Sequence, residues 1–151
     1  MDSEEELLDR YEQEFDFYLN RKRYKDALDV AAKMLASFPN EDRGHYLMAF
    51  VHEHLDNHET ALESINDAIS LAPHDSDYFV FQGDVLLKLN KRDEALHALE
   101  EALRLNPKNE NAFCGLYEYY SAIEYDKKAL SCAKKAIEIT PTDYTMKLMV
   151  D

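Results

Sequence analysis

The chain has four prolines, and they recur at one constant interval: Pro39, Pro73, Pro107 and Pro141. An alanine followed by a leucine recurs in the same register, at Ala27, Ala61, Ala95 and Ala129. A fixed period of about 34 residues is typical of stacked supersecondary units, each of which buries its apolar face against its neighbours. The sequence therefore predicts a single domain over residues 1–151, built from the units 8–41, 42–75, 76–109 and 110–143.

Each unit shows the pattern of two amphipathic helices. Ser3 and Glu6 have the spacing of a capping box that opens the first helix. Apolar residues then recur at helical spacing, stop at the polar stretch 20–23 and resume at Ala27. The proline ends the second helix, because it has no amide hydrogen and disfavours helix in the residue before it. The recurring alanines are small enough for two helices to approach to about 8–10 Å. We expect an all-α fold, a right-handed superhelical solenoid of antiparallel helix pairs.

The repeat resembles the tetratricopeptide repeat (TPR) family over 136 of the 151 residues. The third unit carries the resemblance best, with Phe79, Gly83, Leu86, Ala95, Leu99, Ala102 and Pro107 at signature positions. The first unit departs from the pattern, since Phe15 stands where the family usually has a small residue. The resemblance implies a scaffold that recognises other proteins. It names no pathway, because the family is used in many unrelated ones.

The charge of the chain narrows the class of partner. There are 31 acidic and 17 basic side chains, which give a net charge of −14. Such a surface repels the phosphates of nucleic acids and anionic membranes, so we expect neither as a partner. The basic stretch 21–25 is expected to be a solvated turn. A basic or amphipathic protein segment is the partner that this field would attract.

In arrays that resemble this one, the first helix of each repeat lines a concave groove. Residues three, four and seven positions apart share one face of a helix, so the groove can be assigned. The predicted protein-binding residues are Glu12, Asp16, Tyr46, Phe50, Glu53, Asp77, Val80, Asp84 and Glu118. They form a partly aromatic floor edged by carboxylates, which suits a segment with apolar anchors flanked by lysine or arginine. The alternative is that these residues serve ordinary packing between repeats and surface charge.

One ligand of the family is not expected. Arrays that bind the acidic C-terminal tails of heat-shock chaperones use lysine, asparagine and arginine donors in the groove. The matching positions here carry Glu12, Asp16, Leu47, Asp77 and Phe81. Carboxylates would repel such a tail.

The sequence contains no motif for catalysis or cofactor binding, so neither an enzyme nor a cofactor is expected. The segment 52–58 is the richest in metal ligands, but its predicted turn separates His54 from His58 and His52 takes a packing position. No metal site is therefore expected. Cys114 and Cys132 fall on different helices and are expected to be unreactive thiols, as in a protein of the reducing cytoplasm.

Residues 144–151 begin like another first helix and are predicted to form a short, partial capping helix. So short a helix leaves part of the last apolar edge uncovered. A homodimer formed through this edge, or a longer parent protein, would cover the rest. The leading hypothesis is a cytoplasmic adaptor that binds a basic or amphipathic segment. The alternatives are a regulatory or oligomerisation domain cut from a larger protein, and a small acidic secretion chaperone.

Overall fold

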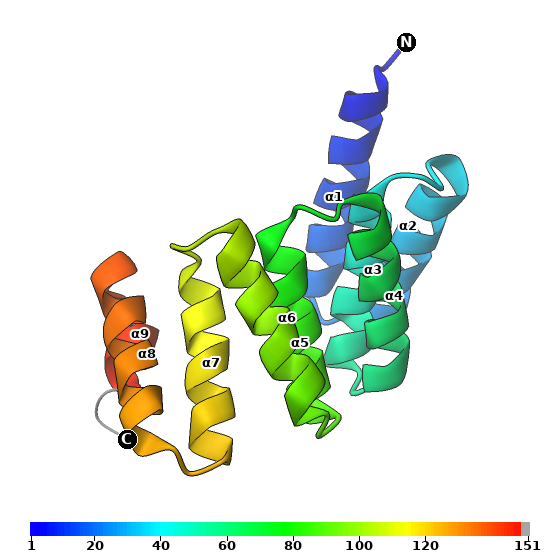
Figure 1. Ribbon diagram of the computed structural model, residues 1–151. Coiled ribbons are helices and arrows are strands. Elements are labelled where there is room, and N and C mark those ends of the chain that lie inside the picture. The colour runs from blue at the N-terminus through cyan, green and yellow to red at the C-terminus, as the bar shows by residue number, and fades with distance from the viewer. Residues whose placement is uncertain (149–151) are drawn as a thin grey trace. The chain divides into compact units, whose positions relative to one another are not determined.

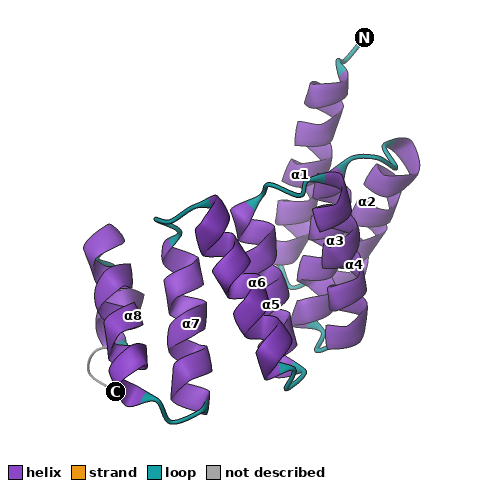
Figure 2. Cartoon of the chain, viewed as in Figure 1, coloured by secondary structure: helices purple, strands orange, loops and turns teal. Residues whose placement is uncertain are grey.

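The computed structural model describes residues 1–148, and over this stretch the chain forms nine α-helices and no strand (Figures 1 and 2). The helices are α1 (Glu4–Asn20), α2 (Tyr24–Ser37), α3 (Asp42–His54), α4 (His58–Leu71), α5 (Ser76–Lys88), α6 (Arg92–Leu105), α7 (Glu110–Ala122), α8 (Asp126–Ile139) and α9 (Asp143–Lys147). They group into two compact units, Met1–Pro73 and His74–Asp151. The predicted all-α fold of helix pairs is confirmed. No helix within the described residues is both long and apolar enough to cross a membrane.

The predicted capping box opens α1. The Glu6 amide donates to Ser3 Oγ at 3.2 Å, and the Ser3 amide donates to Glu6 Oε2 at 2.7 Å. Because this cap precedes residue 8, α1 begins at Glu4, ahead of the unit boundary taken from the proline period. The two reciprocal bonds satisfy amide groups that a helix N-terminus otherwise leaves without partners.

The turn inside each helix pair has the same backbone geometry. The residues Lys22, Asp56, Asn90 and Glu124 have φ between 57° and 59°, and they recur at the same interval as the prolines. The amide of the next residue donates to a carbonyl five positions back at 2.8–2.9 Å, as from Asn57 to His52. This is the bonding of a Schellman motif, in which glycine is the usual left-handed residue. A non-glycine residue here costs about 1–2 kcal/mol.

The core of the first unit joins α1, α2 and α3. Phe15, Ala27, Val30, Ala31 and Val51 form a buried cluster. Phe15 is 1% exposed, so the large residue that departs from the family pattern fills the core. Helix α3 approaches α2 closely, because a Cβ atom built on Gly44 would lie 2.9 Å from Leu35 Cδ2.

The core of the second unit is organised around Leu99. This side chain of α6 is fully buried, in a cluster that includes Val80, Phe113 and Leu116. A Cβ atom on Gly83 would lie 2.8 Å from Leu99 Cγ, and one on Gly115 would lie 2.6 Å from Leu99 Cδ2. Leu99 therefore occupies the space left by glycines of α5 and α7.

A buried polar network joins the ends of three helices in the second unit. Asn109, the N-cap of α7, is 5% exposed, and its Nδ2 donates to Ser76 Oγ at 2.6 Å and to Asp77 Oδ1 at 2.9 Å. Ser76 Oγ donates in turn to the Ala102 carbonyl of α6 at 2.8 Å. The network satisfies groups at the start of α5, the start of α7 and the end of α6, which would be costly to bury without partners.

Helix α9 follows the last helix pair and corresponds to the predicted capping helix 144–151. Thr145 is fully buried, and its hydroxyl donates to the Thr140 carbonyl at 3.0 Å. Leu148 packs against the core of the second unit. The end of the predicted helix, residues 149–151, lies outside the described residues.

An ion cluster joins α1 to α3 in the first unit. Arg43 of α3 contacts four carboxylates: Nη2 to Glu5 at 3.1 Å, Nε to Glu41 at 2.8 Å, Nη1 to Glu12 at 3.5 Å and Nη1 to Asp9 at 4.0 Å. The hydrogen bond with Glu41 raises the pKa of Arg43 above its ordinary value. Burial raises the pKa of Glu12, and the nearby Asp9 adds to this effect while Arg43 opposes it.

We expect Ala95→Leu to be much more destabilising than Ala36→Leu. Ala95 is fully buried, so a larger side chain overpacks its surroundings and lowers the free energy of unfolding by about 1–3 kcal/mol. Ala36 is exposed, and its replacement should change stability by less than about 0.5 kcal/mol. Urea unfolding followed by circular dichroism measures both. Equal midpoints for the two variants would contradict the packing register.

Replacing Arg43 should make stability depend on pH in a defined direction. In Arg43→Met the Glu12 carboxyl loses the cation that opposes the effect of its burial, so its pKa in the folded state rises further above its ordinary value. The folded variant then binds more protons than the unfolded chain, and its stability increases as pH falls. We expect a lower Tm than wild type at pH 7 and a smaller difference near pH 4. The exposed Arg104→Met, which loses a surface pair with Glu101, is the control and should change Tm little at either pH. A deficit independent of pH would contradict the electrostatic role.

Candidate protein-binding face

The predicted residues of the first unit lie on its two first helices. Glu12 and Asp16 belong to α1, and Tyr46, Phe50 and Glu53 belong to α3. Asp16 is exposed, while Glu12, Tyr46 and Phe50 are half-buried. We refer to these five residues, together with His54, as the first-unit face.

Aromatic rings form a row along α3. The Tyr46 and Phe50 ring centroids are 6.1 Å apart, and those of Phe50 and His54 are 4.5 Å apart. Tyr24, at the start of α2, continues the row at 6.0 Å from His54. A row of half-exposed rings offers large apolar contact area with few rotatable bonds.

His54 is a residue of this row that the sequence analysis did not assign to the groove. It lies one helical turn after Phe50, and its Nδ1 is 2.9 Å from the Phe50 carbonyl oxygen. His54, with the sequence pattern around it, was instead interpreted only in terms of metal binding. Its i+4 spacing from an aromatic groove residue is the signal that could have found it.

Glu12 lies beside the guanidinium of Arg43, whose contacts define a position where carboxylates bind a planar cation. Asp16 follows one turn later on α1 and is exposed. The α1 side of the face therefore presents carboxylates, one of which already binds a guanidinium of the same chain.

Glu53 has a different environment from the predicted rim. Its side chain is 11% exposed, and Oε2 lies 2.8 Å from Nδ1 of His58 at the start of α4. This contact joins two helices across their turn. The turn between His54 and His58 is confirmed, and His52 Nδ1 is a buried nitrogen without a hydrogen-bond partner. Within the described residues, no three His, Cys, Asp or Glu side chains are grouped to hold a metal ion.

The predicted residues of the second unit divide between surface and core. Asp77 and Glu118 are exposed and Asp84 is half-buried, whereas Val80 is 6% exposed and belongs to the core cluster. Asp84 of α5 and Glu118 of α7 line one hollow of about 340 Å³, together with Leu87, Lys88, Asn90, Arg92 and Ala122. The structure thus brings two of the four predicted residues together beside basic side chains.

The two cysteines belong to the second unit and are free thiols. Burial raises the pKa of Cys114 to about 11, and nearby Glu110 and Glu118 act in the same direction. Burial also raises the pKa of Cys132. Both thiols are therefore protonated at neutral pH and weakly nucleophilic.

Comparison with known proteins gives the family. The model of the anaphase-promoting complex, cyclosome, subunit 3 family matches residues 20–102, more than half of the chain, and that of anaphase-promoting complex subunit 5 matches residues 78–129. TPR repeat-containing protein MJ1428 of Methanocaldococcus jannaschii is 32% identical over 112 residues, which are 74% of this chain and 20% of that protein. Human protein O-mannosyl-transferase TMTC1 is 29% identical over 115 residues, 66% of this chain and 13% of that protein.

A solved structure agrees with this assignment. The crystal structure of YrrB, described as a TPR protein with an unusual peptide-binding site, superposes with a TM-score of 0.74 at 26% sequence identity. The match covers 89% of this chain and 70% of YrrB. The chain spans only a fifth or less of the curated relatives named above. With its constant repeat period and its helix pairs, the chain belongs to the tetratricopeptide repeat family.

Proposed function

We propose that the protein is a non-catalytic interaction scaffold that binds a basic or amphipathic protein segment, with no cofactor. The observations that carry the proposal are the row of rings on α3 and the carboxylates of α1, which Arg43 of α3 links to the same unit. The TPR family membership supports a scaffold in general, and YrrB offers a relative of similar fold with a peptide-binding site. The proposal includes a cytoplasmic location, for which the two free thiols are the support.

On the first-unit face, an apolar anchor of the partner would pack against Phe50 and His54. A lysine or arginine beside that anchor would pair with Asp16 and Glu12. Arg43 already pairs with Glu12, so a cation of the partner would compete with the Arg43 guanidinium for this carboxylate. It would meet less competition at Asp16. The net charge of −14 would speed the encounter with a basic partner, and salt would weaken this effect.

In the second unit, Asp77, Asp84 and Glu118 are proposed as further acidic contacts for a partner of the same class. Lys88 and Arg92 line the same hollow as Asp84 and Glu118. This hollow therefore suits a segment of mixed charge. Val80 supports the surface from the core and contributes little contact area of its own.

The array could serve as the interaction or regulatory part of a larger protein, because its curated relatives are much longer than this chain. Self-association through the C-terminal edge is the second candidate function. Leu130 of α8 and Met146 of α9 are large apolar side chains that are 42% and 46% exposed. Covering them with a second copy would remove apolar surface from water.

The scaffold proposal is tested by capture from a lysate of the source organism, quantified by mass spectrometry. Phe50→Ala with Asp16→Lys should reduce recovery of specific partners about tenfold or more, as expected for loss of an aromatic anchor and its charge. Phe17→Ala with Asp29→Lys is the matched control, because it makes the same two changes at exposed positions of α1 and α2. Circular dichroism should show both variants to be folded. Equal recovery by the two variants would contradict the assigned face.

The self-association candidate predicts a dimer by light scattering at tens of micromolar protein. Leu130→Glu should shift the mass toward the monomer, since it places a charge in the apolar contact. The control is Leu71→Glu, which replaces a similarly exposed leucine in the first unit. A monomeric wild type at this concentration would exclude the homodimer.

A further inference from the structure

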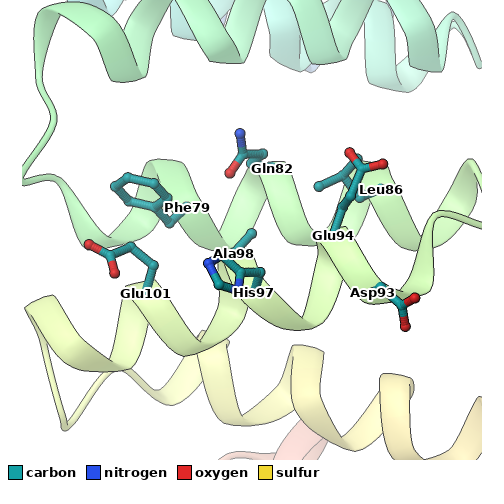
Figure 3. A pocket seen from close by; sticks show the side chains of 8 residues that line it. All are labelled: Phe79, Gln82, Leu86, Asp93, Glu94, His97, Ala98 and Glu101. Atoms are coloured by element: carbon teal, nitrogen blue, oxygen red, sulfur yellow. The ribbon is translucent and has the colours of Figure 1, made fainter.

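The second unit contains a hollow between α5 and α6 that the predicted groove does not include. Its volume is about 620 Å³, and Phe79, Leu86 and Ala98 form an apolar floor (Figure 3). Asp93, Glu94 and Glu101 of α6 provide carboxylates at its edge, and His97 lies beside them. Phe79 and Leu86 are two and nine residues after Asp77, which places them on the opposite side of α5 from Asp77 and Asp84.

The fourth repeat shows what the equivalent position can hold. Phe113 is the counterpart of Phe79 in the next repeat, and Nζ of Lys135 lies 5.5 Å from the Phe113 ring centroid. Nζ of Lys128 lies 5.3 Å from the centroid of Tyr120, the counterpart of Leu86. These distances are those of ammonium groups attracted by aromatic faces. The fourth repeat therefore places its own cations over its own rings.

The third repeat has the opposite charge at the same two positions. Glu94 is the counterpart of Lys128, and Glu101 is the counterpart of Lys135. The aromatic ring is kept as Phe79, while the side chains that could supply a cation have become carboxylates. Arg104 bonds Glu101 through Nε at 2.9 Å and lowers the pKa of that carboxyl, so Glu101 is ionised at neutral pH. The exposed Asp93 and Glu94 add negative charge on the same helix.

We propose that this α5–α6 hollow binds a lysine or arginine side chain of a partner protein. The cationic group lies over the Phe79 ring, as Lys135 does over Phe113, and is paired with Glu101, which lies at the same end of the hollow (Figure 3). Glu94 is two helical turns earlier on α6, about 10 Å away along the helix axis, and adds negative charge at the Leu86 end. Lysine and arginine both carry a long apolar stem behind the charge, and this stem packs on the half-buried Phe79 side chain. Leu86 and Ala98, which are 4% and 5% exposed, support this surface from the core. The hollow of about 620 Å³ also leaves room for a neighbouring aliphatic side chain of the partner, such as leucine. This partner chemistry is argued from the hollow itself and does not depend on the first-unit face.

The test is a titration of the ¹⁵N-labelled protein with two defined peptides, followed by NMR. One is acetyl-Gly-Arg-Leu-Gly-amide, and the other has glutamate in place of arginine. The arginine peptide should shift the amide signals of Phe79, Glu94 and Glu101, and the glutamate peptide should not. Absence of these shifts with the arginine peptide would overturn the proposal.

The most direct test of the acidic residues replaces them with the lysines found at the same positions of the fourth repeat. Glu94→Lys with Glu101→Lys should abolish the shifts, because the protein's own ammonium groups then compete for the ring. The fourth repeat carries lysine at both positions, so this repeat type tolerates the change. Glu59→Lys with Glu63→Lys, at exposed positions of α4, is the control with equal net charge and should bind the arginine peptide as wild type does.

Phe79→Leu tests the ring while keeping an apolar floor. It should weaken peptide binding about threefold, the size of an exposed cation–π contact. Unchanged binding would overturn the role of the ring. Arginine-dependent shifts confined to α1 and α3 would support the first-unit face and overturn the hollow. Shifts confined to α5 and α6 would support the hollow and count against the first-unit face for this peptide.

Discussion

Close approach between helices is the constraint on which the rest of this structure depends. Ala95 and Gly83 leave no room for a larger side chain, and Leu99 fills the space against both Gly83 and Gly115. Leu99 of α6 therefore packs against both α5 and α7. The two glycines, which have no side chain, allow these helices to approach α6 closely. Positions that do not touch this packing can vary with little cost to the core. Among the charged residues discussed above, Asp84 is an exception, because its Oδ1 lies 3.2 Å from a Cβ atom built on Gly115.

The fold could be predicted because packing positions recur once in every repeat, so each repeat supports the same interpretation of the others. The left-handed turns could not be read as easily. Lys22, Asp56 and Glu124 carry no glycine signal, and the repeated hydrogen bond to the carbonyl five residues back stabilises their strained backbone instead. The start of α1, in contrast, was predicted from the capping box of Ser3 and Glu6, although the proline period alone places the first unit later. Local bonds decide helix ends where the periodic pattern is silent.

For the candidate site, the sequence indicated which residues share one face of a helix, but not which side chains of other helices they contact. Helical spacing placed Tyr46 and Phe50 on one side of α3, which their ring contact bears out. It could not show that Glu53 would join His58, because that contact depends on how the chain turns into α4. It also missed the cluster around Arg43, in which α1 and α3 supply charges far apart in the sequence. Side chains long enough to reach a second helix escape an argument based on one helix at a time.

The lysine and arginine side chains of the protein determine how much negative charge its surface presents at each position. Arg43 is shared among four carboxylates, Arg104 is bonded to Glu101, and Lys135 lies over an aromatic ring. Cations held in such short contacts neutralise charge locally, and salt and solvent screen their effect beyond about 10 Å. The negative field is therefore uneven, being weakest where a cation is already bound and strongest where the repeat pattern supplies carboxylates alone. In the proposed scaffold, a partner cation would therefore share Glu12 with Arg43 and Glu101 with Arg104. Asp16 and Glu94, in contrast, form no ion pair with a lysine or arginine within the described part of the chain.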